Sequence, residues 1–296
     1  MKKFWVSFMV ACLATVQLLA APKGDELNVM SYNIRMDTEN DKENAWPYRK
    51  DLAGSMVRFH EVDIFGAQEV LHHQLMDLLE RLPGYDYVGV GREDGKTKGE
   101  YSPIIYRKDR FTVEKQGNFW LAEDINAVGK KGWDAACERV ATWAILKDKQ
   151  SGKRFFFLNT HLDHIGKVAR HEGAKLVLSQ SAKYAEGLPI IVTGDFNATP
   201  DDDPIQVLTN ASDANHLTHT RDLATLKYGP EWTFHNYGRI PFEKRQWIDY
   251  IFVKGNFKVA RHGVITDTQN HLYPSDHCPV LCTLTIEYGN KTKIVE

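Results

Sequence analysis

Residues 188–200 read LPIIVTGDFNATP, and they place a short polar group directly after an apolar run. The run is typical of a buried strand, and Gly194 and Pro200 indicate a turn after it. Asp195 and Asn197 are two residues apart, so their side chains project to the same side of an extended backbone. One can accept a proton from a water molecule while the other holds that water. An Asx-type turn is the structural alternative for the same two residues.

The same arrangement recurs along the chain, with polar residues at the end of an apolar run or inside it. The further clusters are Ser31-Tyr32-Asn33, Gln68-Glu69, Asn159-Thr160-His161, Trp247-Ile248-Asp249-Tyr250 and Ser275-Asp276-His277. They are rich in the residue types that bind a hard divalent cation and transfer protons beside it. We therefore expect the strand ends to converge on one site.

The order of apolar patterns predicts an α/β protein with mixed sheets covered by helices. Strands are expected at residues 27–33, 62–67, 85–91, 102–106, 111–120, 140–146, 155–159, 188–193, 247–253, 257–266 and 279–286, and helices at 46–60, 71–82 and 167–186. Residues 92–100 and 123–133 are charged or rich in glycine, and we expect exposed loops there. Two sheets packed face to face fit the number of strands.

Length and composition favour a single globular domain. The chain has 296 residues, of which 43% are hydrophobic and 26% are charged. No Gly/Ser-rich or Pro-rich linker divides it, and no internal repeat is visible. We expect a signal peptide at residues 1–21 and one domain at 22–296, with its core at about 26–287.

The N-terminus has the pattern of an export signal. Lys2 and Lys3 precede an apolar run at residues 4–19 that is too short to favour a membrane span, and Ala20 and Ala21 follow it. We expect a periplasmic or extracellular protein, with lipid anchoring at Cys12 as the alternative. Removing residues 1–21 takes away two positive charges, so the net charge becomes -2 - 2 = -4. That balance disfavours nonspecific binding to nucleic acid.

Cysteines outside the predicted signal do not form a disulfide framework. Cys137, Cys278 and Cys282 are an odd number, and the last two are too far apart on one straight strand to bond. We expect free thiols.

Three oxygen-bearing side chains suit a magnesium site. Glu69 directly follows a strand, Asn33 offers an amide oxygen at another strand end, and Asp276 is a second carboxylate. Magnesium needs only one or two carboxylates beside a substrate phosphate. Taken alone, Glu69 also suits a solvated helix start and Asn33 a turn. The repeated pattern favours the metal site.

Two histidines suit contact with a phosphoryl group. His277 precedes a buried strand, and Asp249, in an otherwise apolar strand, is the candidate to orient it. His161 ends another strand, where it can stabilise charge on a phosphate oxygen. A structural hydrogen bond is the alternative for Asp249 and His277. Asp163 and His164 suit loop structure instead.

Two other metallohydrolase patterns fit less well. Residues 159–164, NTHLDH, approximate the HxHxDH zinc motif of metallo-β-lactamase-like enzymes, but Asn159 replaces the first histidine. Gly194-Asp195 is similar to a strand end of calcineurin-like phosphatases, but no Gly-Asn-His-Glu motif accompanies it. The chain has no Gly-rich phosphate loop and no GxSxG elbow.

The motifs together resemble those of the endonuclease/exonuclease/phosphatase superfamily, which has the DNase I-like fold. In family order they are MSYNIR (30–35), GAQEV (66–70), NTHLDH (159–164), GDFNATP (194–200), WIDYIF (247–252) and SDHCPV (275–280). The resemblance covers about residues 26–287. It implies a four-layer α/β sandwich, in which two mixed sheets pack face to face between helices, and hydrolysis of a phosphoester with Mg²⁺ or Mn²⁺.

The resemblance also implies roles for individual residues. Asn33, Glu69 and Asp276 correspond to the metal-side residues. The catalytic set comprises the water-activating pair Asp195 and Asn197, the phosphate contacts His161 and His277, and Asp249 as orienter. Arg139, before a strand, is a weaker candidate for phosphate binding. In-line attack of water on phosphorus is the implied mechanism.

The shared motifs do not choose the substrate. An exported phosphodiesterase acting on a phosphorylated glycan, a lipid headgroup, a nucleotide or nucleic acid is the expectation, and no obligate protein partner is indicated. A phosphomonoesterase on a sugar or inositol phosphate and an extracellular nuclease are the alternatives. A noncatalytic binding protein ranks last, since none of the expected catalytic positions is replaced.

Overall fold

The first strand, β1 (Glu26–Asn33), is buried along its whole length after Glu26. The computed structural model describes residues 24–287, so the predicted signal peptide and Cys12 lie outside the described residues. β1 pairs in parallel with β2 (Ile64–Gln68) and antiparallel with β13 (Val280–Ile286). A strand with neighbours on both edges and layers on both faces is expected to be buried on both sides, as this one is.

Two mixed sheets hold all the described strands. The seven-stranded sheet has the order β10 (Leu226–Tyr228), β12 (Phe257–Val264), β13, β1, β2, β4 (Ile104–Arg107) and β3 (Tyr85–Val88). The six-stranded sheet has the order β5 (Phe111–Trp120), β6 (Val140–Asp148), β7 (Arg154–His161), β8 (Ile190–Asp195), β11 (Asp249–Lys254) and β9 (Thr218–His219). Apolar side chains from both sheets, including Val29, Phe157 and Ile191, form the core between them.

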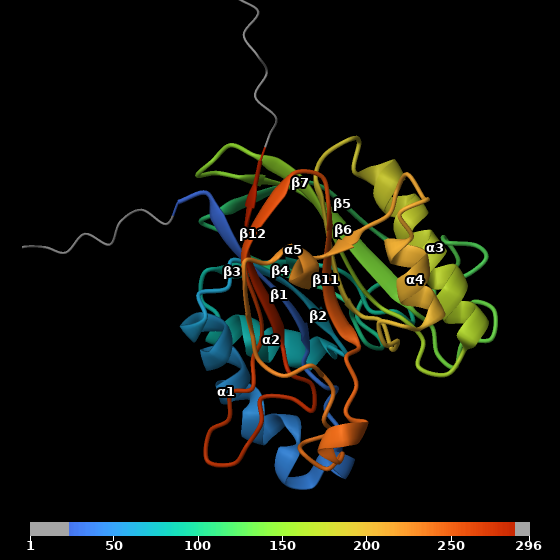
Figure 1. Ribbon diagram of the computed structural model, residues 1–296. Helices are drawn as coiled ribbons and strands as arrows, with labels where there is room; N and C mark the ends of the chain where they lie inside the picture. The colour runs from blue at the N-terminus through green and yellow to red at the C-terminus, as the bar shows by residue number, and fades with distance from the viewer. Residues whose placement is uncertain (1–23, 288–296) are drawn as a thin grey trace, which may run out of the picture.

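Helices cover the outer faces of both sheets (Figure 1). The helices α1 (Trp46–Phe59) and α2 (His72–Arg81) lie on the seven-stranded sheet, and α3 (Lys167–Tyr184) and α4 (Asp203–Thr209) lie on the six-stranded sheet. Short helices η1 (Glu39–Asn44), α5 (Thr220–Leu223) and η2 (Phe242–Lys244) occupy the connections. The predicted four-layer sandwich is confirmed. None of the described helices has the length and apolar character needed to cross a membrane.

Several local expectations were wrong. The strand predicted at 85–91 ends at Val88, and β9 and β10 had no sequence signal. The exposed loop predicted at residues 92–100 is confirmed, and hydrogen bonds hold it internally, since Arg92 N donates to Glu100 O at 3.0 Å and Glu93 N donates to Lys98 O at 3.2 Å. Among the described cysteines, Cys137, Cys278 and Cys282 are free, as predicted.

The strand directions bring the polar clusters to one edge. β7 and β8 are parallel, with His161 opposite Asp195, and β11 runs antiparallel to β8 with Asp249 opposite Asp195. The carboxyl ends of β1, β2, β7 and β8 and the amino ends of β11 and β13 therefore meet at the same edge of the sandwich.

Candidate active site

Asn33 lies at the centre of the polar groups gathered at this edge. Its Nδ2 donates to Oε1 of Glu69 at 3.0 Å and to Oδ2 of Asp195 at 2.9 Å, and lies 3.4 Å from Nε2 of His277. Its Oδ1 accepts from the backbone N of Arg35 at 2.9 Å. The amide nitrogen, rather than the predicted ligand oxygen, therefore faces the carboxylates in this structure.

Glu69, Asp195 and His277 form the tightest group of metal-ligand types among the described residues. One ligand atom from each lies within 4.8 Å of the others. Burial acts to raise the pKa of Glu69, but the positive charge of His277 and the hydrogen bond from Asn33 hold this pKa below its ordinary value. Ionised carboxylates are suitable ligands for Mg²⁺ or Mn²⁺, so the Glu69 carboxylate fits a hard divalent cation.

Asp276 lies in the same cavity but outside that group of three. Its Oδ2 is 3.8 Å from Nε of Arg35, and Ser275 Oγ donates to its Oδ1 at 3.4 Å. Burial and the negative charge of Glu69 raise the pKa of Asp276. A nearby cation would lower this pKa by stabilising the ionised carboxylate.

His277 and Asp249 form a buried pair. The Nδ1 of His277 lies 2.9 Å from Oδ2 of Asp249, and both side chains are almost fully buried. Burial opposes protonation, but the charge and hydrogen bond of Asp249 raise the pKa of His277 to about 10. A protonated imidazole cannot ligate a metal ion. His277 is therefore placed to donate a proton or hydrogen bond from Nε2, which lies 3.8 Å from Asp195 Oδ2.

Asp195 has the character of a base poised near neutral pH. Burial and the negative charge of Asp249 raise its pKa to about 7, against the opposing effects of His277 and the backbone N of Asn197. That N donates to Asp195 Oδ1 at 2.9 Å, and Asn197 has φ 46°. The Asx-type turn predicted as an alternative is thus present. It also places Asn197 beside the cluster, since asparagine tolerates the left-handed region.

His161 is held neutral beside two arginines. Asn197 Nδ2 lies 2.9 Å from its Nε2, which then acts as acceptor, and its Nδ1 has no partner among the described residues. Burial and the charges of Arg139 and Arg92 hold the pKa of His161 well below its ordinary value. Two guanidinium groups therefore act electrostatically on the side of the site around His161.

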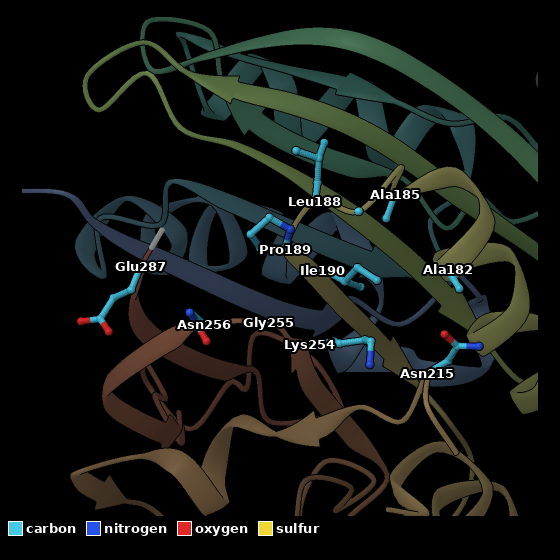
Figure 2. Close-up of a pocket in the computed structure, with 11 residues that line it drawn as sticks. Ala182, Ala185, Leu188, Pro189, Ile190, Asn215, Lys254, Gly255, Asn256 and Glu287 are labelled. Atoms are coloured by element: carbon cyan, nitrogen blue, oxygen red, sulfur yellow. The ribbon is translucent and has the colours of Figure 1, made fainter. Parts of the chain in front are cut away.

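One cavity of about 520 Å³ is lined by most of the residues predicted from the sequence, namely Glu69, Arg139, His161, Asp195, Asn197, Asp276 and His277. Asn33 and Asp249 are not lining residues, but Asn33 contacts Glu69 and Asp249 contacts His277, both of which line the cavity. The lining residues that were not predicted include Arg35, which directly follows the first polar cluster, and Arg92 and Glu100, which lie in the loop expected to be exposed. A different cavity, shown in Figure 2, lies beside Pro189 and Lys254 and has a volume of about 460 Å³. It is next to the start of β8 and the end of β11, at the other end of these two strands from the active-site cavity.

A model of the endonuclease/exonuclease/phosphatase family matches residues 30–277. The chain belongs to this family. Members of this family are hydrolases that act on phosphoesters, and they typically depend on a divalent metal ion. The matched range begins in β1 and ends at His277, so it contains every predicted site residue. Their individual roles remain predictions.

Solved structures of bacterial members are similar over most of the chain. The endonuclease/exonuclease/phosphatase from Bacteroides vulgatus is 42% identical with a TM-score of 0.85, and covers 88% of this chain and 99% of its own. A mannosyl-6-phosphatase from Bacteroides thetaiotaomicron VPI-5482 is 40% identical with a TM-score of 0.82, covering 88% and 100%.

A curated eukaryotic relative is more distant. The CCR4-Not complex 3′-5′-exoribonuclease subunit Ccr4 of Mycosarcoma maydis is 25% identical, over 90% of this chain and 51% of the relative. The chain thus spans about half the length of the Ccr4 subunit that it matches.

Proposed function

We propose that this chain is a divalent-metal-dependent phosphomonoesterase that releases phosphate from a phosphorylated sugar. The observation that carries the proposal is the arrangement of charge in one cavity. Glu69, Asp195 and His277 cluster at the strand ends, and Arg139 and Arg92 act electrostatically on His161 beside them. A monoester carries up to two negative charges, and cationic groups around the phosphoryl position stabilise it more than a singly charged diester.

The similarity to a mannosyl-6-phosphatase over all of that protein's solved chain supports a sugar phosphate as substrate. We thus rank the phosphomonoesterase above the phosphodiesterase, whereas the sequence alone favoured the phosphodiesterase. The similarity to an exoribonuclease supports a phosphodiesterase as the competing hypothesis. It ranks second because that relative is only 25% identical and about half of its length is matched.

The chain's own groups divide the work of hydrolysis as follows. Asp195, with its pKa near 7, accepts a proton from the attacking water, and Asn197 orients that water. Protonated His277 donates a hydrogen bond to a phosphoryl oxygen, and neutral His161 contacts another. The bond between phosphorus and the sugar oxygen breaks as the bond to water forms, the leaving oxygen takes up a proton from solvent, and Asp195 releases its proton to solvent. A divalent cation held by Glu69 and its neighbours would offset charge on the phosphoryl oxygens.

The test is a panel of phosphoesters with the purified chain. Hexose 6-phosphates, inositol phosphates, 4-nitrophenyl phosphate, bis-(4-nitrophenyl) phosphate, RNA and plasmid DNA are each incubated with Mg²⁺, with Mn²⁺ and with chelator. Chelator-sensitive phosphate release from hexose phosphates, lost in Asp195→Asn, supports the proposal. Cleavage of the diesters alone contradicts it and favours the competing hypothesis.

We also propose that the chain is exported, because Lys2, Lys3 and the apolar run at residues 4–19 precede Ala20-Ala21. Sequencing of the mature N-terminus tests this. A start at residue 22 supports signal cleavage, a lipid-modified Cys12 supports the alternative, and an intact Met1 in the cytosol contradicts export.

A further inference from the structure

The loop at residues 92–100 presents two charged side chains to the active-site cavity. Hydrogen bonds hold it internally, from Gly91 N to Lys96 O at 3.0 Å and from Lys98 N to Asp94 Oδ1 at 2.9 Å. Trp120 Nε1 donates to Arg92 O at 2.7 Å and fixes its base. A loop with this many bonds is a preorganised support for the side chains at its two ends.

Those side chains are Arg92 and Glu100. Their Nη2 and Oε1 atoms lie 2.7 Å apart, and the side chains are only 13% and 12% exposed. The buried Nε of Arg92 has no partner among the described residues. The contact thus leaves one guanidinium donor unused, and Glu100 retains a second carboxylate oxygen with further capacity to accept.

Arg139 differs from Arg92 in its partners. Its nearest carboxylate, Asp163, lies 3.4 Å away and also accepts from the backbone N atoms of Ile165 and Gly166 at 2.9 and 2.7 Å. Because Asp163 is shared with backbone donors, Arg139 keeps more of its attraction for an anion. Arg92 is paired more closely with Glu100, which repels phosphate. The Arg92–Glu100 contact therefore suits uncharged hydroxyl groups, for which it offers both a donor and an acceptor.

The position of the pair matches a substrate's leaving group. A small hollow of about 10 Å³ is bordered by Arg92, Glu100, Arg139 and His161, so the pair adjoins the groups that face phosphate. Both residues also line the larger cavity that holds Glu69 and His277. A substrate whose phosphate lies against His277 and Arg139 has its remaining atoms within the same cavity.

We propose that Arg92 and Glu100 form the subsite for the sugar part of the substrate and recognise hydroxyl groups on adjacent carbons. The proposal rests on the proposed function and names two specificity-determining residues for it. Glu100 accepts from the hydroxyl groups, and Arg92 holds Glu100 in place through the contact between its Nη2 and Glu100 Oε1.

The test compares two substrates that share a phosphate and differ in hydroxyl groups. The ratio of kcat/KM for a hexose 6-phosphate to kcat/KM for 4-nitrophenyl phosphate is measured for wild type, Glu100→Gln and Arg92→Met. Glu93→Gln is the matched control, since Glu93 lies in the same loop with its side chain exposed. Binding of the free hexose is measured in parallel by saturation-transfer NMR, which does not depend on turnover.

We expect the ratio to fall at least tenfold in Glu100→Gln and in Arg92→Met, mainly through KM for the sugar phosphate, with no change in Glu93→Gln. The free hexose should bind wild type and lose binding in Glu100→Gln. Equal losses on both substrates, or an unchanged ratio, would overturn the subsite and leave the proposed function standing. Hexose binding that depends on Glu100, in a chain that cleaves only diesters, would retain the subsite and overturn the proposed function. A wild-type chain that neither binds hexose nor cleaves its phosphate would overturn both.

Discussion

Asp249 and His277 join the two sheets of the sandwich through one buried contact, with Asp249 Oδ2 2.9 Å from His277 Nδ1. Asp249 begins β11 in the six-stranded sheet, and His277 precedes β13 in the seven-stranded sheet. The contact fixes the tautomer and orientation of the imidazole, and it leaves Nε2 directed toward Asn33 and Asp195. The packing of the two sheets therefore determines where the proton donor lies.

Replacing Asp249 by Asn should separate orientation from charge. The amide keeps the shape of the side chain but removes the charge that raises the pKa of His277 to about 10, so this pKa should fall. We expect kcat to decrease about 100-fold, as for other residues that orient a catalytic group. NMR titration of the His277 ring and steady-state kinetics measure the two effects.

Asp148→Asn is the control for that variant, because Asp148 is a buried carboxylate paired with Arg110 at 3.4 Å, outside the active-site cavity. It should reduce stability and leave the His277 titration unchanged. If His277 titrates identically in Asp249→Asn and wild type, the orienting role is wrong.

Removing the Glu69 carboxylate should weaken metal binding more than folding. Glu69→Gln keeps an acceptor for Asn33 but loses the charge that attracts a divalent cation. We expect the Kd for Mn²⁺, measured by calorimetry, to rise on the order of 100-fold, and chelator to abolish the activity of wild type. Glu80→Gln, at an exposed carboxylate on α2, is the control and should bind Mn²⁺ like wild type. Unchanged Mn²⁺ affinity in Glu69→Gln would remove Glu69 from the ligand set.

Most of the site could be predicted because its residues follow strands. Apolar runs identify β1, β2, β7 and β8, and parallel pairing brings Asn33, Glu69, His161 and Asp195 together. The antiparallel placement of Asp249 opposite Asp195 was not predicted, because periodicity does not determine strand order.

The remainder depends on tertiary contacts that no local pattern encodes. Arg92 and Glu100 meet because their loop bends back on itself, and a charged segment rich in glycine gives no sign that its ends line a cavity. Asn33 directs its Nδ2 toward the carboxylates because the backbone N of Arg35 satisfies its oxygen. Both contacts follow from backbone geometry beyond the strand end.

Gly66 is predicted to be essential for the close approach of the two sheets. A Cβ at this position would lie 2.1 Å from Thr193 Oγ1 and 2.3 Å from Asn159 Oδ1. Asn159 is not free to move, since its Nδ2 donates to Ala67 O at 2.7 Å and its Oδ1 accepts from Gln68 Nε2 at 2.7 Å. We expect Gly66→Ala to lower the free energy of unfolding by about 3 kcal/mol or more, through overpacking and broken buried hydrogen bonds.

Urea denaturation measures this effect, with Gly263→Ala as the matched strand control. The nearest atom to a Cβ at Gly263 is 3.6 Å away, which is an ordinary contact, so the change in stability should stay within about 0.5 kcal/mol. Equal stability of the two variants would show that the sheets can separate at Gly66 without cost.

His262 should make folding sensitive to acid. It is buried on β12, with Nδ1 3.0 Å from Thr220 Oγ1 and Nε2 without a partner among the described residues. Burial, together with the positive charges of Arg221 and Lys227, lowers its pKa from 6.5 to about 3. The unfolded chain therefore binds one more proton than the folded chain between these two values, so this contribution to stability is lost as the pH falls through that window.

Between pH 7 and pH 5 this one group should cost about 2 kcal/mol of unfolding free energy. Denaturant unfolding of His262→Asn and wild type at both pH values measures it as a difference, which cancels the contributions of other titrating groups. Thr220→Val is the control, because it removes the hydroxyl contact and keeps the imidazole. This variant should be less stable at both pH values and keep the wild-type dependence on pH. If His262→Asn shows the same loss between pH 7 and pH 5 as wild type, His262 is not a source of the acid sensitivity.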